Sequence, residues 1–357
     1  MALFNVARKW IILTPAGAAA GAAADLAFYI AALRDRAGLG RTAPPIADAG
    51  GAAPPDSAPV IILNAGDFPP DHSAGRGRNG FTWRAGQDRI EIYGDSDRGL
   101  CNGVFDFLSS LGLRWPVPGG EELPDPAGGD EYQLTTDRAC TPSEDIPENR
   151  RRIVIDKKTA PKKRDALIRW AARNKIDALV FSLDDRALRH LRDRKDTLAL
   201  AKRYAMIIEA GGWDLSLLVP RRYFFFQRDL FRMDAGKRVR RFNFCPTNPQ
   251  TVALVKKQGK RRFGALLRFH PEIGTFHLWP DRDHETAWCS CPACRAFSRA
   301  EQNRMALCAA ADALAEIAPA ARLSFLEEAS GDVPGSAANA PPPRPNLFRL
   351  EAAPRLW

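Results

Sequence analysis

The chain has 357 residues, of which 45% are hydrophobic and 26% are charged. That composition supports one large core or two domains, and no run of about 18 apolar residues suggests a membrane-spanning helix. Seven cysteines, four of them close together in sequence, form a poor disulfide framework and favour a reducing compartment. The apolar N-terminal run is broken by Pro15 and Gly17, so we expect no signal peptide, a cytoplasmic location and no membrane partner.

The formal net charge is +10, and basic residues cluster at 150–164, 236–241 and 256–262. Such clusters are compatible with a nucleic acid or another polyanion. No nucleic-acid-binding motif accompanies them, so a solvated basic face is the favoured interpretation. We therefore expect no nucleic-acid partner, and the sequence leaves the oligomeric state open.

The first part of the chain alternates between strand and helix patterns. Strands are predicted at 9–14 and 60–66, a helix within 19–39, and a hairpin at 81–94. A second helix should follow Asp95 and Ser96, which suit its cap, and five apolar residues share one of its faces. These are Leu100, Val104, Phe107, Leu108 and Leu111. Residues 1–140 are therefore predicted to form a small N-terminal α/β domain.

Residues 141–357 show repeated strand and helix patterns. Strands are predicted at 151–156, 176–183, 213–220, 275–280, 321–328 and 346–354, and helices at 166–174, 198–210, from 249 to about 257, and at 299–317. Short strands alternating with helices indicate either a doubly wound sheet or a (β/α) TIM-type barrel. No phosphate-binding glycine loop follows the first strand, which favours the barrel. Six strands are fewer than eight, so we expect an incomplete barrel, truncated towards the C-terminus.

Several motifs resemble known families. The stretch from Asp95 to Gly119, DSDRGLCNGVFDFLSSLGLRWPVPG, is similar to the N-terminal domains that precede the catalytic barrels of alpha-glucuronidases and beta-hexosaminidases. Segments 170–181, 211–220, 243–249 and 277–298 resemble a bacterial family of unknown function that joins this domain to a glycoside-hydrolase-like barrel. The resemblance implies a carbohydrate substrate. Trp213 departs from it, because relatives usually carry His there, and members of the family continue beyond residue 357.

Carboxyl groups that follow predicted strands are the candidates for catalysis. Active sites of barrels lie at the C-terminal ends of the strands, and glycoside hydrolysis uses two carboxyls. Asp281 or Asp283 is the predicted general acid, since neighbouring Trp279 could desolvate it, and Glu327 is the second candidate. The alternative is that these acids cap turns. Further acids follow strands at Asp184, Asp185 and Glu328.

Aromatic residues near these acids are candidates for binding substrate. His277, Trp279 and Asp281 alternate along a predicted strand and therefore share one face. Trp213 begins another predicted strand and could stack on a sugar or pack internally. The alternative for His277 is a hydrogen-bonded core histidine.

Three cysteines in C-x-C-x-x-C spacing, Cys289, Cys291 and Cys294, suit a thiolate metal site. Zinc prefers four such ligands in a tetrahedron, and either Cys245 or His284 could be the fourth. A structural zinc that fixes the loop is the favoured hypothesis, and reduced buried thiols are the alternative. A catalytic metal is not expected, because all ligands would be thiolates with no open position.

The combined prediction is a glycoside hydrolase that uses carboxylate acid/base catalysis at the barrel rim. The alternative is a non-catalytic carbohydrate-binding protein, with Trp213, Trp279 and Trp288 contacting glycan, or an inactive fragment of such an enzyme. The sequence does not identify the sugar or the stereochemical outcome.

Overall fold

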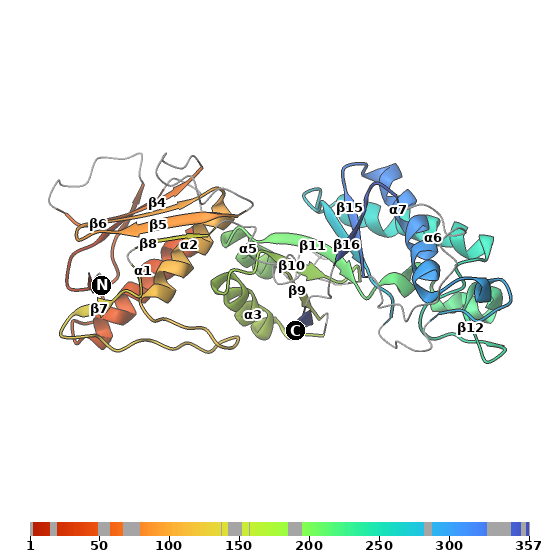
Figure 1. Cartoon of the computed structure of the whole chain (residues 1–357), viewed down its shortest axis with the longest axis horizontal. Coiled ribbons are helices and arrows are strands. Elements are labelled where there is room, and N and C mark those ends of the chain that lie inside the picture. Colours follow the sequence, from red (N-terminus) through yellow and green to blue (C-terminus); the bar gives the residue numbers. More distant parts are fainter. Residues whose placement is uncertain are drawn as a thin grey trace. The chain divides into compact units, whose positions relative to one another are not determined.

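The structure is a computed structural model that describes most of the chain. It covers residues 3–14, 20–48, 58–66, 79–136, 138–141, 152–156, 158–184, 195–281, 288–326, 344–350 and 355–356. The chain divides into two compact units (Figure 1). The first comprises Met1–Arg151, Thr159–Ala178 and Lys195–Ile207, and the second Arg152–Lys158, Leu179–Arg194 and Ile208–Trp357. Helices α3 (Pro161–Arg173) and α5 (Lys195–Arg203) therefore belong to the first unit.

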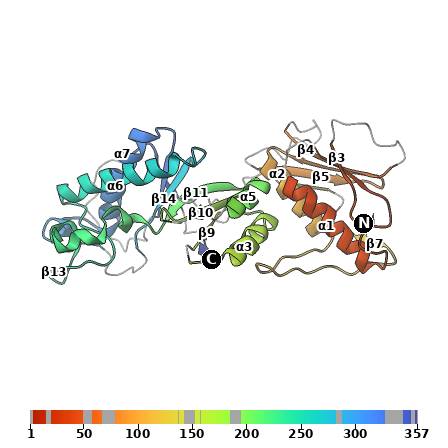
Figure 2. The same cartoon turned by 180° about the vertical axis from the view of Figure 1, so that it is seen from behind.

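The first unit contains a six-stranded mixed sheet in the order β3-β2-β4-β6-β5-β8. Its strands are β2 (Ile11–Thr14), β3 (Ile46–Asp48), β4 (Val60–Ala65), β5 (Phe81–Ala85), β6 (Arg89–Gly94) and β8 (Arg138–Thr141). The first four in the order are parallel, while β5 runs antiparallel to β6 and β8. A separate antiparallel pair joins β1 (Leu3–Asn5) to β7 (Glu131–Gln133). Helices α1 (Ala20–Arg36) and α2 (Asp97–Ser110) lie together beside the sheet, as Figures 1 and 2 show.

Helix α2 forms as the sequence predicts. The Ser96 side chain caps it by accepting a hydrogen bond from the Gly99 amide, and the helix's apolar face is buried. The motif arginine Arg98 is also buried, at 3.3 Å from Asp177. Its guanidinium donates to three backbone carbonyls as well, those of Ala172, Ile176 and Tyr204. Within this unit Arg98 therefore anchors segments that are far apart in sequence.

The second unit is built on a sheet in the order β16-β15-β14-β11-β10-β9-β17, in which the pairs β16–β15, β15–β14, β14–β11 and β9–β17 are parallel. These strands are β9 (Arg152–Ile155), β10 (Ala178–Phe181), β11 (Ile207–Gly212), β14 (Thr275–Leu278), β15 (Arg322–Leu326), β16 (Leu347–Leu350) and the two-residue β17 (Arg355–Leu356). An eight-stranded barrel also uses parallel strands joined through helices. The predicted fold class is confirmed: a small α/β domain precedes a partial TIM-type (β/α) barrel.

One predicted strand was wrong. The sequence favoured a strand at 213–220, but the third barrel strand is β11, and 215–218 form the 3-10 helix η4 (Leu215–Leu218). Strand β11 ends in Gly211 and Gly212, with φ of 122° and 120°. A Cβ at Gly211 would lie 1.8 Å from the backbone oxygen of His277, so only glycine permits this approach of β11 to β14.

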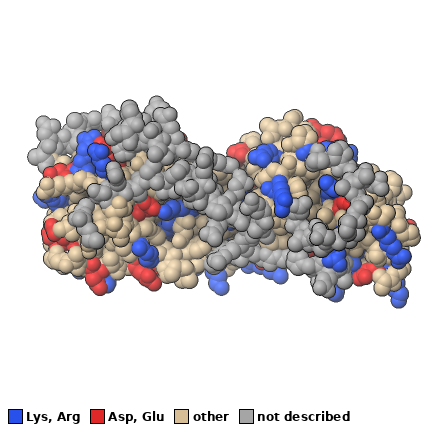
Figure 3. All heavy atoms as spheres, in the orientation of Figure 1, with Lys and Arg blue, Asp and Glu red and all other residues tan. Residues whose placement is uncertain are grey.

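Two long helices belong to this unit, α6 (Pro249–Leu267) and α7 (Arg299–Ile317). Phe263 of α6 packs edge-on against Phe276 of β14, with ring centroids 5.0 Å apart. Lys256 and Lys260 of α6 form ion pairs with Asp312 and Glu316 of α7. Part of the basic cluster at 256–262 is therefore neutralised locally, and Figure 3 shows both signs of charge mixed over the face that it draws.

No helix within the described part of the chain combines the length and the apolarity needed to cross a bilayer.

Candidate functional site

The carboxyl end of β14 leads directly into Trp279, Pro280 and Asp281. In parallel α/β sheets this end of the strands is where ligands bind. The Asp281 carboxylate accepts a hydrogen bond from the Ser216 hydroxyl at 3.1 Å and lies 3.5 Å from the Arg221 guanidinium. Its backbone amide donates to the Asn243 side chain at 3.2 Å. Ser216 and Arg221 therefore hold the carboxyl group of Asp281, and Asn243 holds its backbone.

Burial raises the pKa of Asp281 above its ordinary value, while the nearby Arg221 charge and the Ser216 hydrogen bond oppose that rise. The side chain retains 21% of its surface exposed. A general acid must be accessible to the substrate and protonated at the working pH. Partial burial leaves Asp281 accessible, and its raised pKa favours the protonated form that a general acid needs.

His277 and Trp279 have no exposed surface in the structure. The His277 ring contacts Glu209 Oε2 through Nε2 at 2.9 Å and Ser324 Oγ through Nδ1 at 2.5 Å. The indole N–H of Trp279 donates to the same Ser324 oxygen at 3.2 Å. The structure thus shows the alternative interpretation, a hydrogen-bonded core histidine, and it leaves the Trp279 ring no open face for a sugar.

Glu209 was missed by the sequence analysis, which placed it in a helix. It lies on β11, is fully buried, and makes a two-point ion pair with Arg152 of β9 at 2.7 and 3.1 Å. Burial raises the pKa of Glu209, but the His277 hydrogen bond and the neighbouring positive charges outweigh it and lower the pKa to about 2. A strand prediction for IIEAGG, in place of the helix, is the sequence signal that could have placed this acid on the sheet.

Trp213 is the half-buried aromatic at this edge of the sheet. Its ring packs edge-on against Trp279 at a centroid distance of 4.8 Å. Beneath it lies a buried cluster of Val154, Val180, Trp279 and Leu350. Of the two predicted sugar-contacting tryptophans here, Trp213 is the one with accessible surface.

Other predicted candidates divide into two groups. Asp184 is described and pairs with Arg262 at 2.7 Å. The rest lie outside the described residues: Asp185, Asp283, His284, Glu327 and Glu328. Of the three acids predicted to be catalytic, Asp281 is therefore the one whose contacts the structure describes.

The structure brings four cysteines together in the second unit. Cys289, Cys291 and Cys294 are joined by Cys245, all four are buried, and their sulfur atoms lie within 4.8 Å of one another. The Cys245 sulfur is 3.8 Å from that of Cys291 and 3.6 Å from that of Cys294. Zinc–sulfur bonds of about 2.3 Å in a tetrahedron place the sulfurs about 3.8 Å apart. The donor set and its spacing therefore fit a zinc ion.

Neighbouring groups orient this cysteine cluster. The Met233 amide and the Arg238 guanidinium donate to the Cys289 sulfur at 3.2 and 3.8 Å. The Gln302 side chain of α7 accepts from the Cys289 amide and donates to the carbonyls of Cys289, Cys294 and Phe297. Such outer contacts position metal ligands and offset the negative charge of thiolates.

Thiol contacts within the cluster shift the pKa values in opposite directions. Hydrogen bonds from Cys289 and Cys294 lower the pKa of Cys245. The same contact with Cys245 raises the pKa of Cys289 to about 11 and raises that of Cys294. Four adjacent sulfurs cannot all ionise without a cation, which is the ordinary coupling of thiol ionisation to metal binding.

Comparison with known proteins shows similarity at the level of fold. No protein-family model and no curated protein matches the chain. Among solved structures, the GH20 beta-N-acetylhexosaminidase from Streptomyces coelicolor A3(2) is 10% identical, with a TM-score of 0.52 over 97% of this chain and 65% of that chain. The Flavobacterium johnsoniae chitobiase is 13% identical, with a TM-score of 0.52 over 91% of this chain and 50% of that one.

The chain thus spans between half and two thirds of the length of these two structures. Identities this low establish a shared architecture and leave chemistry undecided. The conclusion is that the protein shares the fold of these two structures over most of its length.

Proposed function

We propose that this protein is a carbohydrate-active enzyme of the glycoside-hydrolase type, with Asp281 as its general acid. The observation that supports this most directly is a partly accessible carboxyl with a raised pKa at the carboxyl end of the parallel sheet. The fold it shares with beta-N-acetylhexosaminidases is compatible with this chemistry.

In the proposed reaction Asp281 donates a proton to the leaving glycosidic oxygen. Ser216 and Arg221 fix its carboxylate, and Trp213 offers an aromatic surface to the sugar ring. His277, Trp279 and Glu209 support this edge from the core rather than contact substrate. Where the enzyme supplies a second carboxyl, we assign it to Asp283 or Glu327. In substrate-assisted hydrolysis the substrate itself provides the nucleophile.

The test is turnover of nitrophenyl glycosides, beginning with N-acetyl-beta-hexosaminides because the structural neighbours act on hexosaminides by name. Asp281→Asn should lower kcat by roughly 10²-fold or more, the usual size of a general-acid contribution. Asp125→Asn is the matched control, since Asp125 is 81% exposed and lies in the other unit. Unchanged turnover in Asp281→Asn would remove Asp281 from this role.

A non-catalytic carbohydrate-binding protein is the second candidate. It is favoured by the burial of His277 and Trp279, which leaves Trp213 as the accessible aromatic of the three predicted binding residues. Binding to immobilised glycans that Trp213→Ala abolishes, together with no turnover of any glycoside, would establish it over the enzyme.

We also propose that the cysteine cluster binds a structural zinc. All four ligands would be thiolates, so no position is open for a substrate, and the ion would fix the loop that follows β14. Buried reduced thiols also suit a reducing compartment, in line with the cytoplasmic location proposed from the sequence.

Elemental mass spectrometry of the native protein tests this assignment. One zinc per chain is expected in the wild type and in Cys308→Ser, whose thiol is buried elsewhere in the fold. Cys291→Ser should lose most of the metal. A metal-free native protein with every thiol titratable would end the proposal.

A further inference from the structure

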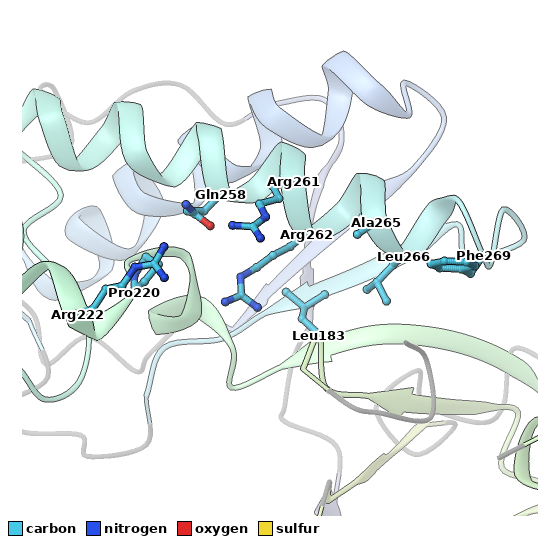
Figure 4. A pocket seen from close by; sticks show the side chains of 9 residues that line it. All are labelled: Leu183, Pro220, Arg222, Gln258, Arg261, Arg262, Ala265, Leu266 and Phe269. Carbon is cyan, nitrogen blue, oxygen red and sulfur yellow. The ribbon is translucent and has the colours of Figure 1, made fainter. Parts of the chain in front are cut away.

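A cavity of about 380 Å³ lies in the second unit, between helix α6 and the segments that follow β10 and β11. Its volume is within the range of small-molecule sites, about 300–1,000 Å³. Three arginines and a glutamine contribute its polar surface: Arg222, Arg261, Arg262 and Gln258. Figure 4 shows these side chains directed into the space between α6 and the facing loop.

The polar groups of this arginine cavity are incompletely matched within the described part of the chain. Arg262 pairs with Asp184 through Nη1 at 2.7 Å, but its buried Nε has no hydrogen-bond partner there. Arg222 and Arg261 are exposed residues that line the cavity, and neither forms an ion pair with a described carboxylate. Gln258 is 5% exposed, lines the cavity, and has no side-chain hydrogen bond among the described residues. The Nε of Arg262 is the one buried donor of this cavity that lacks a partner among the described residues, which is costly, and the two exposed guanidiniums add positive charge beside it, so the cavity favours an anion as occupant.

The rest of the cavity wall is apolar. It is formed by Leu183, Pro220, Ala265, Leu266 and Phe269. Phe269 is an aromatic that is 47% exposed. A free inorganic ion would leave this surface unused, whereas an acidic group carried on a sugar ring would place the ring's C–H face against it.

The cavity adjoins the proposed acid through consecutive residues. In the 3-10 helix η5 (Arg221–Phe225), Arg221 lies 3.5 Å from Asp281, and the next residue, Arg222, lines the cavity. Consecutive residues of η5 therefore contact the proposed acid and line the cavity.

We propose that the arginine cavity binds a sugar residue that bears a carboxylate or sulfate group, and so selects acidic glycans. The assignment of a sugar as the ligand rests on the proposed function, and the inference adds the class of sugar that the enzyme would select. Two forked guanidiniums recognise either anion, because both offer paired oxygens.

Calorimetric titration with three matched nitrophenyl glycosides tests the proposal: a neutral hexoside, the corresponding hexuronide and its 6-sulfate. The acidic ligands should bind at least tenfold more tightly than the neutral one. Arg222→Gln and Arg261→Gln should each reduce this preference about tenfold, and 0.5 M salt should weaken only the acidic ligands. Arg268→Gln, an exposed arginine that follows the same helix α6, is the matched control and should change nothing.

The uronide and sulfate arms identify which anion is selected. Equal affinity for neutral and acidic ligands, or an equal effect of Arg268→Gln, would overturn the inference. If inorganic sulfate binds as tightly as the sugar sulfate, the proposed contact of the cavity with a sugar ring is wrong. Acidic binding that persists in Asp281→Asn, without turnover in any variant, would keep the cavity assignment while the hydrolase proposal fails.

Discussion

Replacement of Glu209 by Gln should destabilise the centre of the parallel sheet. Gln preserves the shape but removes the negative charge that faces Arg152 and His277, leaving a positive charge buried without its partner. The pKa of Glu209 falls from 4.5 to about 2 in the fold. That shift corresponds to about 3 kcal/mol in favour of the charged form, at about 1.4 kcal/mol for each pKa unit.

The same shift fixes the sign of the pH dependence. Because the folded pKa lies below the unfolded value, the contribution is fully present above about pH 5 and is lost as the pH falls towards 2. The difference between wild type and Glu209→Gln should therefore shrink from about 3 kcal/mol at pH 7 to about 2 kcal/mol at pH 3.5.

Hydrogen exchange measured by mass spectrometry on peptides of β11 and β14 gives the local free energy of opening. Glu316→Gln is the control, because its side chain is 52% exposed and its partner is the exposed Lys260. That exchange should cost under about 1 kcal/mol. If Glu209→Gln costs no more than the control at pH 7, or if the difference grows in acid, the reasoning about the buried network is wrong.

Three further outcomes are expected. Arg221→Met removes a charge that lowers the pKa of Asp281, so the alkaline limb of the kcat/KM profile should move to higher pH, and an unchanged or lower limb would contradict the general-acid role. Gly211→Ala should destabilise β11 by well over 1 kcal/mol, measured by the same hydrogen exchange, because its Cβ meets the His277 backbone; a tolerated Ala would contradict the close strand approach. Gln302→Ala should speed the release of zinc to a chelator by loosening the cysteine loop, while an unchanged rate would show that the side chain does not position it.

Local sequence patterns determined much of this protein. The apolar face and Ser96 cap specified α2, because helix periodicity and capping depend on neighbouring residues. The alternation of strands and helices specified a β/α architecture for the same reason. The short spacing of Cys289, Cys291 and Cys294 identified three thiols of the proposed metal site, because they are close together in sequence.

Tertiary structure decided the remainder. Cys245 joins the cluster although it lies 46 positions before Cys291. The cysteine spacing alone did not decide whether Cys245 or His284 would be the fourth ligand. Glu209 contacts His277 because β11 pairs with β14, and the two residues are 68 positions apart in the sequence. His277 and Trp279 have the residue types of a binding face, yet the sheet buries them; burial depends on strands that are distant in sequence and therefore lies beyond what a local pattern can specify.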